Sequence, residues 1–207
     1  MFTNIKFYCI INSMKKDYNK MFNEIIDSLE GKPKLLLHVC CAPCYSGVFE
    51  RLKDFDLTLY YYNPNTYPEE EYEVRYHEFE KFNQNKIVKE KYNHNEFLEK
   101  AIGLEQEKEG GSRCEKCIRL RIEKSFQFAL DNGYDYVTTS LSVSPYKNAE
   151  FINNLGKELE EKFGVKYLFA DFKKENGYLK SIQNSKEFGL YRQDYCGCEF
   201  SNRIKIF

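Results

Sequence analysis

The stretch Lys34-Leu35-Leu36-Leu37-His38-Val39-Cys40-Cys41-Ala42-Pro43-Cys44 decides how this chain folds. Its first six residues form a short, largely apolar run, which predicts a buried strand over 34–39. Pro43 is typical of the first turn of a helix, where its missing N–H is no loss, and we expect a helix over roughly 44–53. The stretch therefore predicts a strand that leads directly into a helix, with three cysteines at the junction.

The same alternation of short strands and longer helices continues along the chain. Apolar positions and stop signals such as Asn132-Gly133 predict further strands at 57–62, 86–90, 136–140 and 165–170. They predict helices at 18–30, 70–83, 95–104, 115–132, 149–163 and 178–187. Strands that alternate with helices of this length indicate βαβ units. We therefore expect an α/β fold with a mostly parallel central sheet flanked by helices, of Rossmann-like or adenine-nucleotide-hydrolase-like type.

The sequence contains no repeat, low-complexity tract or Pro/Gly-rich linker, which favours one domain. We expect residues 33–207 to form the α/β catalytic domain and residues 1–32 to form an N-terminal helical extension. In open parallel sheets, ligands bind at the carboxyl ends of the strands. Cys40 and Cys41 follow the first predicted strand, and Ser140 and Ser142 close the fourth. The sequence therefore predicts a metal site at the carboxyl edge of the sheet.

Charge and hydropathy exclude several classes of protein. The 207 residues carry a formal net charge of −1, so any contact with nucleic acid must come from a local basic patch. The longest apolar runs are too short for a spanning helix, and the N-terminus lacks a small-residue cleavage site. We therefore expect a cytoplasmic protein with no membrane partner.

Eight cysteines are the strongest chemical signal, and seven fall into three groups, Cys40-Cys41-x-x-Cys44, Cys114-x-x-Cys117 and Cys196-Gly197-Cys198. In a reducing cytoplasm, clustered cysteines indicate metal or redox chemistry rather than structural disulfides. The first two groups together supply the four thiolates that a 4Fe-4S cluster or a structural zinc site requires. Cys9 stands alone and is predicted to be a small buried hydrophobe.

The first and third groups carry further information about reactivity. A strand end that leads into a helix N-terminus favours thiolates, the form that binds iron, at Cys40, Cys41 and Cys44. A disulfide between Cys196 and Cys198 would be strained and readily reduced, which suits a working redox pair. The alternative is that both are further metal ligands. The role of Cys44, and a second single iron beside the cluster, stay open.

Five segments, in this order, resemble the motifs of the QueH-type epoxyqueuosine reductases. They are His38-Val39-Cys40-Cys41-Ala42-Pro43-Cys44, Asn63-Pro64-Asn65 with Glu71-Tyr72 and Arg75, Cys114/Cys117 with Arg119, Thr138–Asn148, and Tyr191–Ser201. The resemblance extends from about residue 34 to residue 201. An ordered set of this kind is far more specific than a single CxxC pair.

The resemblance implies removal of the epoxide oxygen from epoxyqueuosine at the wobble position of tRNA, the last step of queuosine biosynthesis. It implies that a 4Fe-4S cluster is held by Cys40, Cys41, Cys114 and Cys117. It implies a redox-active pair, able to form a disulfide bond, at Cys196 and Cys198. The partners would be the tRNA anticodon loop and an unidentified electron donor.

Proximity to the cysteines makes Asp194, His38 and Tyr191 candidate proton donors, although His38 could equally be a satisfied core residue. The five basic residues of segment 113–124 form a candidate tRNA contact, or else a solvated helix face. Two other functions remain to be weighed: a zinc-stabilised RNA-binding module without catalysis, and another cluster-dependent tRNA-modifying enzyme. An ATP-dependent enzyme is disfavoured because no glycine follows the first strand to admit a phosphate.

Overall fold

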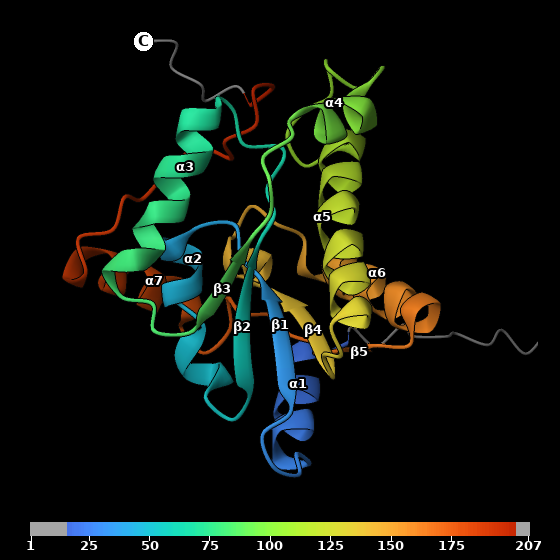
Figure 1. Cartoon of the computed structure of the whole chain (residues 1–207), viewed down its shortest axis with the longest axis vertical. Coiled ribbons are helices and arrows are strands. Elements are labelled where there is room, and N and C mark those ends of the chain that lie inside the picture. The colour runs from blue at the N-terminus through green and yellow to red at the C-terminus, as the bar shows by residue number, and fades with distance from the viewer. Residues whose placement is uncertain (1–15, 202–207) are drawn as a thin grey trace, which may run out of the picture.

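The computed structural model describes residues 16–201, which form one parallel five-stranded sheet between helices (Figure 1). The strand order is β3-β2-β1-β4-β5, and all four neighbouring pairs are parallel. The strands are β1 (Lys34–His38), β2 (Asp56–Tyr61), β3 (Lys86–Lys89), β4 (Tyr136–Thr139) and β5 (Lys166–Tyr167). The predicted α/β class is confirmed.

The helices form a layer on each face of this sheet. They are α1 (Tyr18–Asp27), α2 (Ala42–Ser46), α3 (Glu69–His77), α4 (Asn95–Ala101), α5 (Ser112–Asp131), α6 (Ala149–Phe163) and α7 (Gly177–Glu187). Short 3-10 turns η1 (Phe49–Leu52), η2 (Glu78–Lys81) and η3 (Ser140–Val143) complete the chain. None of the described helices is both long and apolar enough to cross a membrane.

Alternation along β1 divides the core into two parts. Leu35 and Leu37 pack with Phe22 of α1 and Tyr45 of α2 on one face of the sheet. On the other face, Leu36 packs among residues of α5 and α6. The central strand is thus buried on both faces, as its continuous apolar run predicts.

Two predicted elements differ from the structure at their ends. The helix expected over 44–53 begins at Ala42 and breaks into α2 and η1. The strand expected over 165–170 pairs with β4 only at Lys166 and Tyr167. Ala170 instead bonds through both its backbone groups to the Asn153 side chain, at 3.0 and 2.9 Å.

The predicted N-terminal helix is present as α1, and it packs Phe22 into the main core. Residues 1–15, which include Cys9, lie outside the described part of the chain. The role predicted for Cys9 and the boundary between 1–32 and 33–207 therefore stay predictions.

Candidate active site

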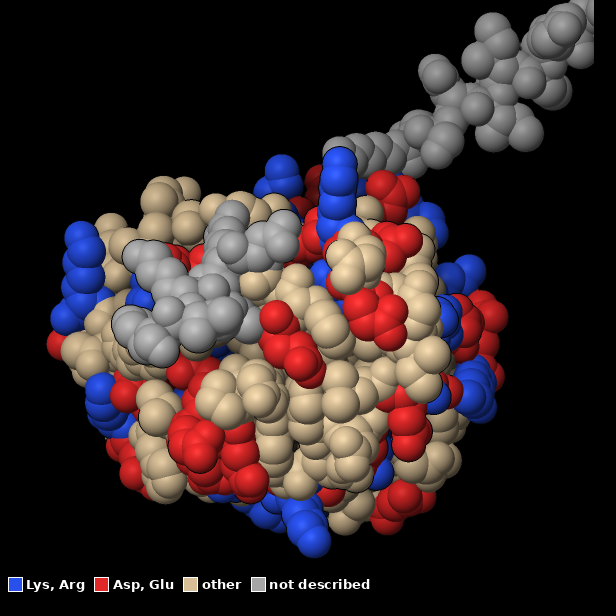
Figure 2. Space-filling view, turned by 90° about the horizontal axis from the view of Figure 1, so that it is seen from above, with Lys and Arg blue, Asp and Glu red and all other residues tan. Residues whose placement is uncertain are grey.

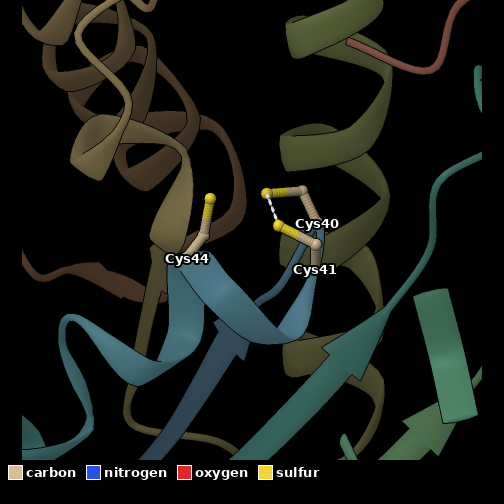
Figure 3. Close-up of side chains that lie close together, drawn as sticks. All are labelled: Cys40, Cys41 and Cys44. Atoms are coloured by element: carbon tan, nitrogen blue, oxygen red, sulfur yellow. Dashed lines mark hydrogen bonds between the residues drawn. The ribbon is translucent and has the colours of Figure 1, made fainter. Parts of the chain in front are cut away.

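The first cysteine group forms a compact cluster of sulfur atoms at the carboxyl end of β1. The sulfurs of Cys40, Cys41 and Cys44 all lie within 4.8 Å of one another. Figure 3 shows them entering the same space beyond the end of β1. Within residues 16–201, no other three His, Cys, Asp or Glu side chains come together in this way. Cys44, whose role the sequence left open, is a full member of this group.

The backbone around α2 fixes these three sulfurs. Cys41 is the N-cap residue of α2 and is fully extended, with Pro43 in the first turn. One turn later, the Tyr45 N–H donates to the Cys41 carbonyl at 3.2 Å. The Asn63 side chain donates to the Val39 carbonyl at 2.9 Å and so ties the end of β1 to the loop after β2.

The three thiols of this group have different pKa values. Hydrogen bonds with Cys41 and Cys44 hold the pKa of the Cys40 thiol well below its ordinary value. The hydrogen bond with Cys40, together with burial, raises the pKa of both Cys41 and Cys44. Cys40 Sγ also lies 3.9 Å from Ser140 Oγ, which brings the carboxyl ends of β1 and β4 together as predicted. One thiolate is therefore stabilised within a sulfur-rich pocket.

A cavity of about 330 Å³ opens beside this cluster. Its lining brings the first cysteine group together with Cys196 of the third. It also contains four cationic and two acidic side chains: Arg75, Arg121, Lys147, Arg192, Glu109 and Asp194. The cavity therefore combines cysteine sulfur atoms with a positive electrostatic environment.

The segment that carries Cys196 and Cys198 is held against the domain by several contacts. The Arg75 guanidinium donates to the Cys196 carbonyl at 3.1 Å, and the Tyr67 N–H donates to the Gly197 carbonyl at 2.9 Å. Lys147 Nζ lies 3.6 Å from Cys196 Sγ. Gly197 has a φ of +91°, and a Cβ there would lie 2.8 Å from the Arg75 guanidinium. Only glycine fits this position without strain.

The second cysteine group lies in the first two turns of α5. Cys117 packs with Cys198, Phe97 and Ala101 in a small apolar cluster, against which Cys196 also packs. The structure thus joins the second and third groups. The sulfurs of Cys114 and Cys117, however, do not enter the compact group that Cys40 and Cys41 form.

All seven described cysteines are free thiols. Burial raises the pKa of Cys198 to about 12 and also raises that of Cys117. The ligand set Cys40, Cys41, Cys114 and Cys117 and the redox pair Cys196/Cys198 stay predictions.

The family described as "Epoxyqueuosine reductase QueH" matches residues 35–204, which is most of the chain. The chain belongs to this QueH family. Its relatives named "Epoxyqueuosine reductase QueH" include proteins of Streptococcus pyogenes (35% identical, covering 93% of this chain and 81% of the relative) and Staphylococcus epidermidis (38%, 92% and 87%). The Thermotoga maritima protein of that name is 39% identical over 81% of this chain and 89% of its own length.

The three candidate proton donors, Asp194, His38 and Tyr191, lie in different environments in the structure. Asp194 lines the cavity, whereas His38 and Tyr191 do not. His38 is fully buried in β1; its Nδ1 lies 2.8 Å from Thr139 Oγ1 and its Nε2 lies 3.2 Å from the Tyr62 carbonyl. Burial lowers the pKa of His38 to about 3. His38 is therefore a satisfied core histidine that joins β1 to its neighbours.

The basic segment 113–124 is not one exposed patch. Arg113 and Arg121 are buried, and Arg119 forms a bidentate ion pair with Glu158. Figure 2 looks onto the end of the molecule toward which the strands run, and basic and acidic side chains are interspersed over it. A uniform basic surface is thus not seen on this face.

Sequence reasoning missed Arg121 and Arg192 as parts of the site. Arg121 follows Cys117 by four residues on α5, so the two side chains share one helix face. That spacing could have identified Arg121. Arg192 reaches the cavity from the irregular segment after α7, where no periodicity predicts which way a side chain points.

Proposed function

We propose that this chain is an epoxyqueuosine reductase that acts on tRNA. The observation that carries the proposal is the family match over residues 35–204. The cavity that Cys40, Cys41, Cys44 and Cys196 line together supports it. The reaction takes an epoxide, two electrons and two protons and gives an alkene and water. The substrate would be the wobble nucleoside epoxyqueuosine in the anticodon loop, and the product would be queuosine. A tRNA substrate supports a cytoplasmic location for the enzyme.

The cysteines fit an iron–sulfur cluster. Thiolates are the ligands that such clusters use, and the partly buried group at Cys40, Cys41 and Cys44 is an assembly of sulfur donors. We propose that Cys40, Cys41, Cys114 and Cys117 hold a 4Fe-4S cluster. When bound, the cluster supplies electrons and a Lewis-acidic iron to the epoxide oxygen.

Cys44 provides a second possibility for ligation. Its sulfur already lies within 4.8 Å of those of Cys40 and Cys41. This proximity supports an alternative in which Cys44 replaces a ligand from α5 or helps hold a second, single iron.

Cys196 and Cys198 can supply the two electrons and two protons that the reaction consumes. Oxidation of two thiols to a disulfide releases two electrons and two protons, which is what removal of the epoxide oxygen as water consumes. Gly197 gives the short loop the backbone freedom that a pair two residues apart requires. An external electron donor must then reduce the disulfide before the next turnover.

Asp194 is the proposed proton donor to the leaving oxygen. It lines the cavity next to Cys196 and is thus placed to reach a bound epoxide.

The test is conversion of epoxyqueuosine in tRNA by anaerobically purified protein with a chemical reductant, followed by nucleoside mass spectrometry. The native chain should form queuosine, and Cys196→Ser should form none while it keeps the visible absorption of the cluster. Loss of the absorption from Cys196→Ser would show that this residue is a ligand. Native protein that holds zinc alone and forms no queuosine would support a structural zinc module instead.

A further inference from the structure

Arg121 is a buried cation at the centre of the cysteine groups. α5 places it one turn after Cys117, and its side chain lines the cavity that Cys40, Cys41, Cys44 and Cys196 share. Only 3% of the residue is exposed. Among residues 16–201, no carboxylate lies within 4.0 Å of its guanidinium nitrogens. Its positive charge is therefore not neutralised by an acidic side chain.

The hydrogen bonds of Arg121 are long and go to neutral groups. Nε donates to the Cys117 carbonyl at 3.3 Å, and one terminal nitrogen donates to Asn63 Oδ1 at 3.4 Å. Two other buried arginines have shorter hydrogen bonds. Arg75 pairs with Glu71 at 2.7 Å, and Arg113 donates to four backbone carbonyls, three of them at 2.7–2.9 Å. The contacts of Arg121 are therefore weaker than those that hold Arg75 and Arg113, and they do not by themselves explain why this cation is buried.

Burying a cation without an anionic partner is costly, so the surroundings of Arg121 should contain negative charge. The groups available are sulfur atoms. Arg121 lines the cavity together with the first cysteine group and Cys196, and its Nε contacts the backbone of Cys117. The geometry therefore pairs Arg121 with the cysteine groups as a whole.

We propose that Arg121 is a positioning residue that balances the negative charge of the cysteine-bound cluster and thereby raises its reduction potential. This inference rests on the proposed function, because it needs the cluster to be present. Uptake of one electron makes a cluster one unit more negative. A fixed cation in a buried environment stabilises that reduced form more than the oxidised form.

The experiment is an anaerobic redox titration of the purified protein, monitored by visible absorption and electron paramagnetic resonance. Arg121→Met removes the charge and keeps an unbranched side chain of moderate length, and Arg121→Lys restores the charge. Arg51→Met is the matched control. Arg51 is also largely buried, but it lies over the Phe22 ring and pairs with Glu175 away from the cavity.

Arg121→Met should make reduction less favourable by about tenfold, a shift of about 59 mV toward negative potential for one electron. Arg121→Lys should lie near the native value, and Arg51→Met should match it. If Arg121→Met releases iron and Arg121→Lys retains it, the charge is again what the site needs, and the proposal is supported.

An Arg121→Met protein with native iron content and an unmoved potential would overturn the proposal, even if its thermal stability falls. Loss of iron from both Arg121 variants would also overturn it, because the guanidinium shape rather than the charge would then matter. A native protein without iron and sulfide would instead defeat the proposed cluster, and the two failures are thereby distinguishable.

Discussion

At the scale of single residues, Gly197 shows how one backbone position shapes the site. Its φ of +91° and the approach of the Arg75 guanidinium leave no room for a side chain. We predict that Gly197→Ala lowers the free energy of unfolding by about 1–3 kcal/mol and impairs turnover, because the Cys196–Cys198 loop must shift. Urea unfolding and the tRNA assay would measure the two effects.

Gly103→Ala is a suitable control for this prediction. Gly103 has a φ of +74°, and a Cβ there would meet nothing within 4 Å. Gly103→Ala carries the backbone strain alone and should leave turnover intact. Equal losses of stability and activity in both variants would show that the contact with Arg75 is unimportant.

His38 predicts an acid-sensitive stability. The pKa of His38 is about 3 in the folded protein, compared with 6.5 for an unperturbed histidine such as that of the unfolded chain. As the pH falls, the unfolded chain therefore binds a proton before the folded protein does, and the folded state loses stability. This contribution is fully present above pH 6.5 and is lost between pH 6.5 and about pH 3, at up to about 1.4 kcal/mol per pH unit.

Urea unfolding of the metal-free protein at pH 7 and pH 5.5 would measure this slope. His38→Asn keeps an amide donor and acceptor but does not titrate, so its stability should change less over the same range. An identical slope in both proteins would contradict the assignment.

The site was partly predictable at this scale. The spacing of the cysteines singled out side chains that the structure places close together, because cysteine pairs are rare and chemically specific. Six of the seven described cysteines lie in the cavity lining or in the small apolar cluster around Cys117, and their roles stay predictions. The cationic lining was less visible. Arg121 and Arg192 are two of many basic residues in the chain, and only the fold shows that they lie beside sulfur while Arg119 lies at the surface.

At the scale of secondary-structure elements, the periodicities located all five strands and all seven helices that the structure describes. The element ends were less predictable, because tertiary contacts decide them. β5 is shortened where Asn153 binds Ala170, and the helix after β1 breaks after Ser46. A hydrogen bond from a distant side chain to a strand's backbone leaves no pattern in the sequence from which the end of the strand could be predicted.

A ligand of the proposed cluster could come from the N-terminus of either of two helices, from α2 through Cys44 or from α5 through Cys114. We predict that Cys114→Ser lowers iron and sulfide content strongly, whereas Cys44→Ser leaves most of it, because the family resemblance assigns ligation to α5. Metal analysis and the visible spectrum of both variants would decide. The opposite pattern would favour the compact group that the structure shows at Cys40, Cys41 and Cys44.

At the scale of the whole molecule, the parallel sheet explains why cysteines from distant parts of the sequence meet. The carboxyl ends of β1 and β4 lie side by side, and α5 and the segment after α7 reach the same edge. The sequence predicted this edge from topology. It did not predict that Cys196 would line one cavity with the first cysteine group, or that Cys196 and Cys198 would pack with Cys117.

The cavity rim provides a test of tRNA binding. Tyr146 lines the rim and is 62% exposed, so a base next to the wobble nucleoside could stack on it. Such stacking contributes about 1–3 kcal/mol per base. We predict that Tyr146→Ala raises the KM for tRNA about fivefold or more and changes kcat little.

Ile102→Ala is the control for this effect, because Ile102 is more exposed and lies outside the cavity lining. An unchanged KM in Tyr146→Ala, or an equal rise in Ile102→Ala, would exclude stacking on Tyr146.

We propose that this chain uses a cysteine-bound iron–sulfur cluster in its reaction. The most direct test is the iron and acid-labile sulfide content of anaerobically purified protein, together with its visible spectrum. We predict about four of each per chain, with iron in excess of sulfide if a second single iron is present. Zinc without iron, sulfide or visible absorption would contradict the proposed iron–sulfur cluster.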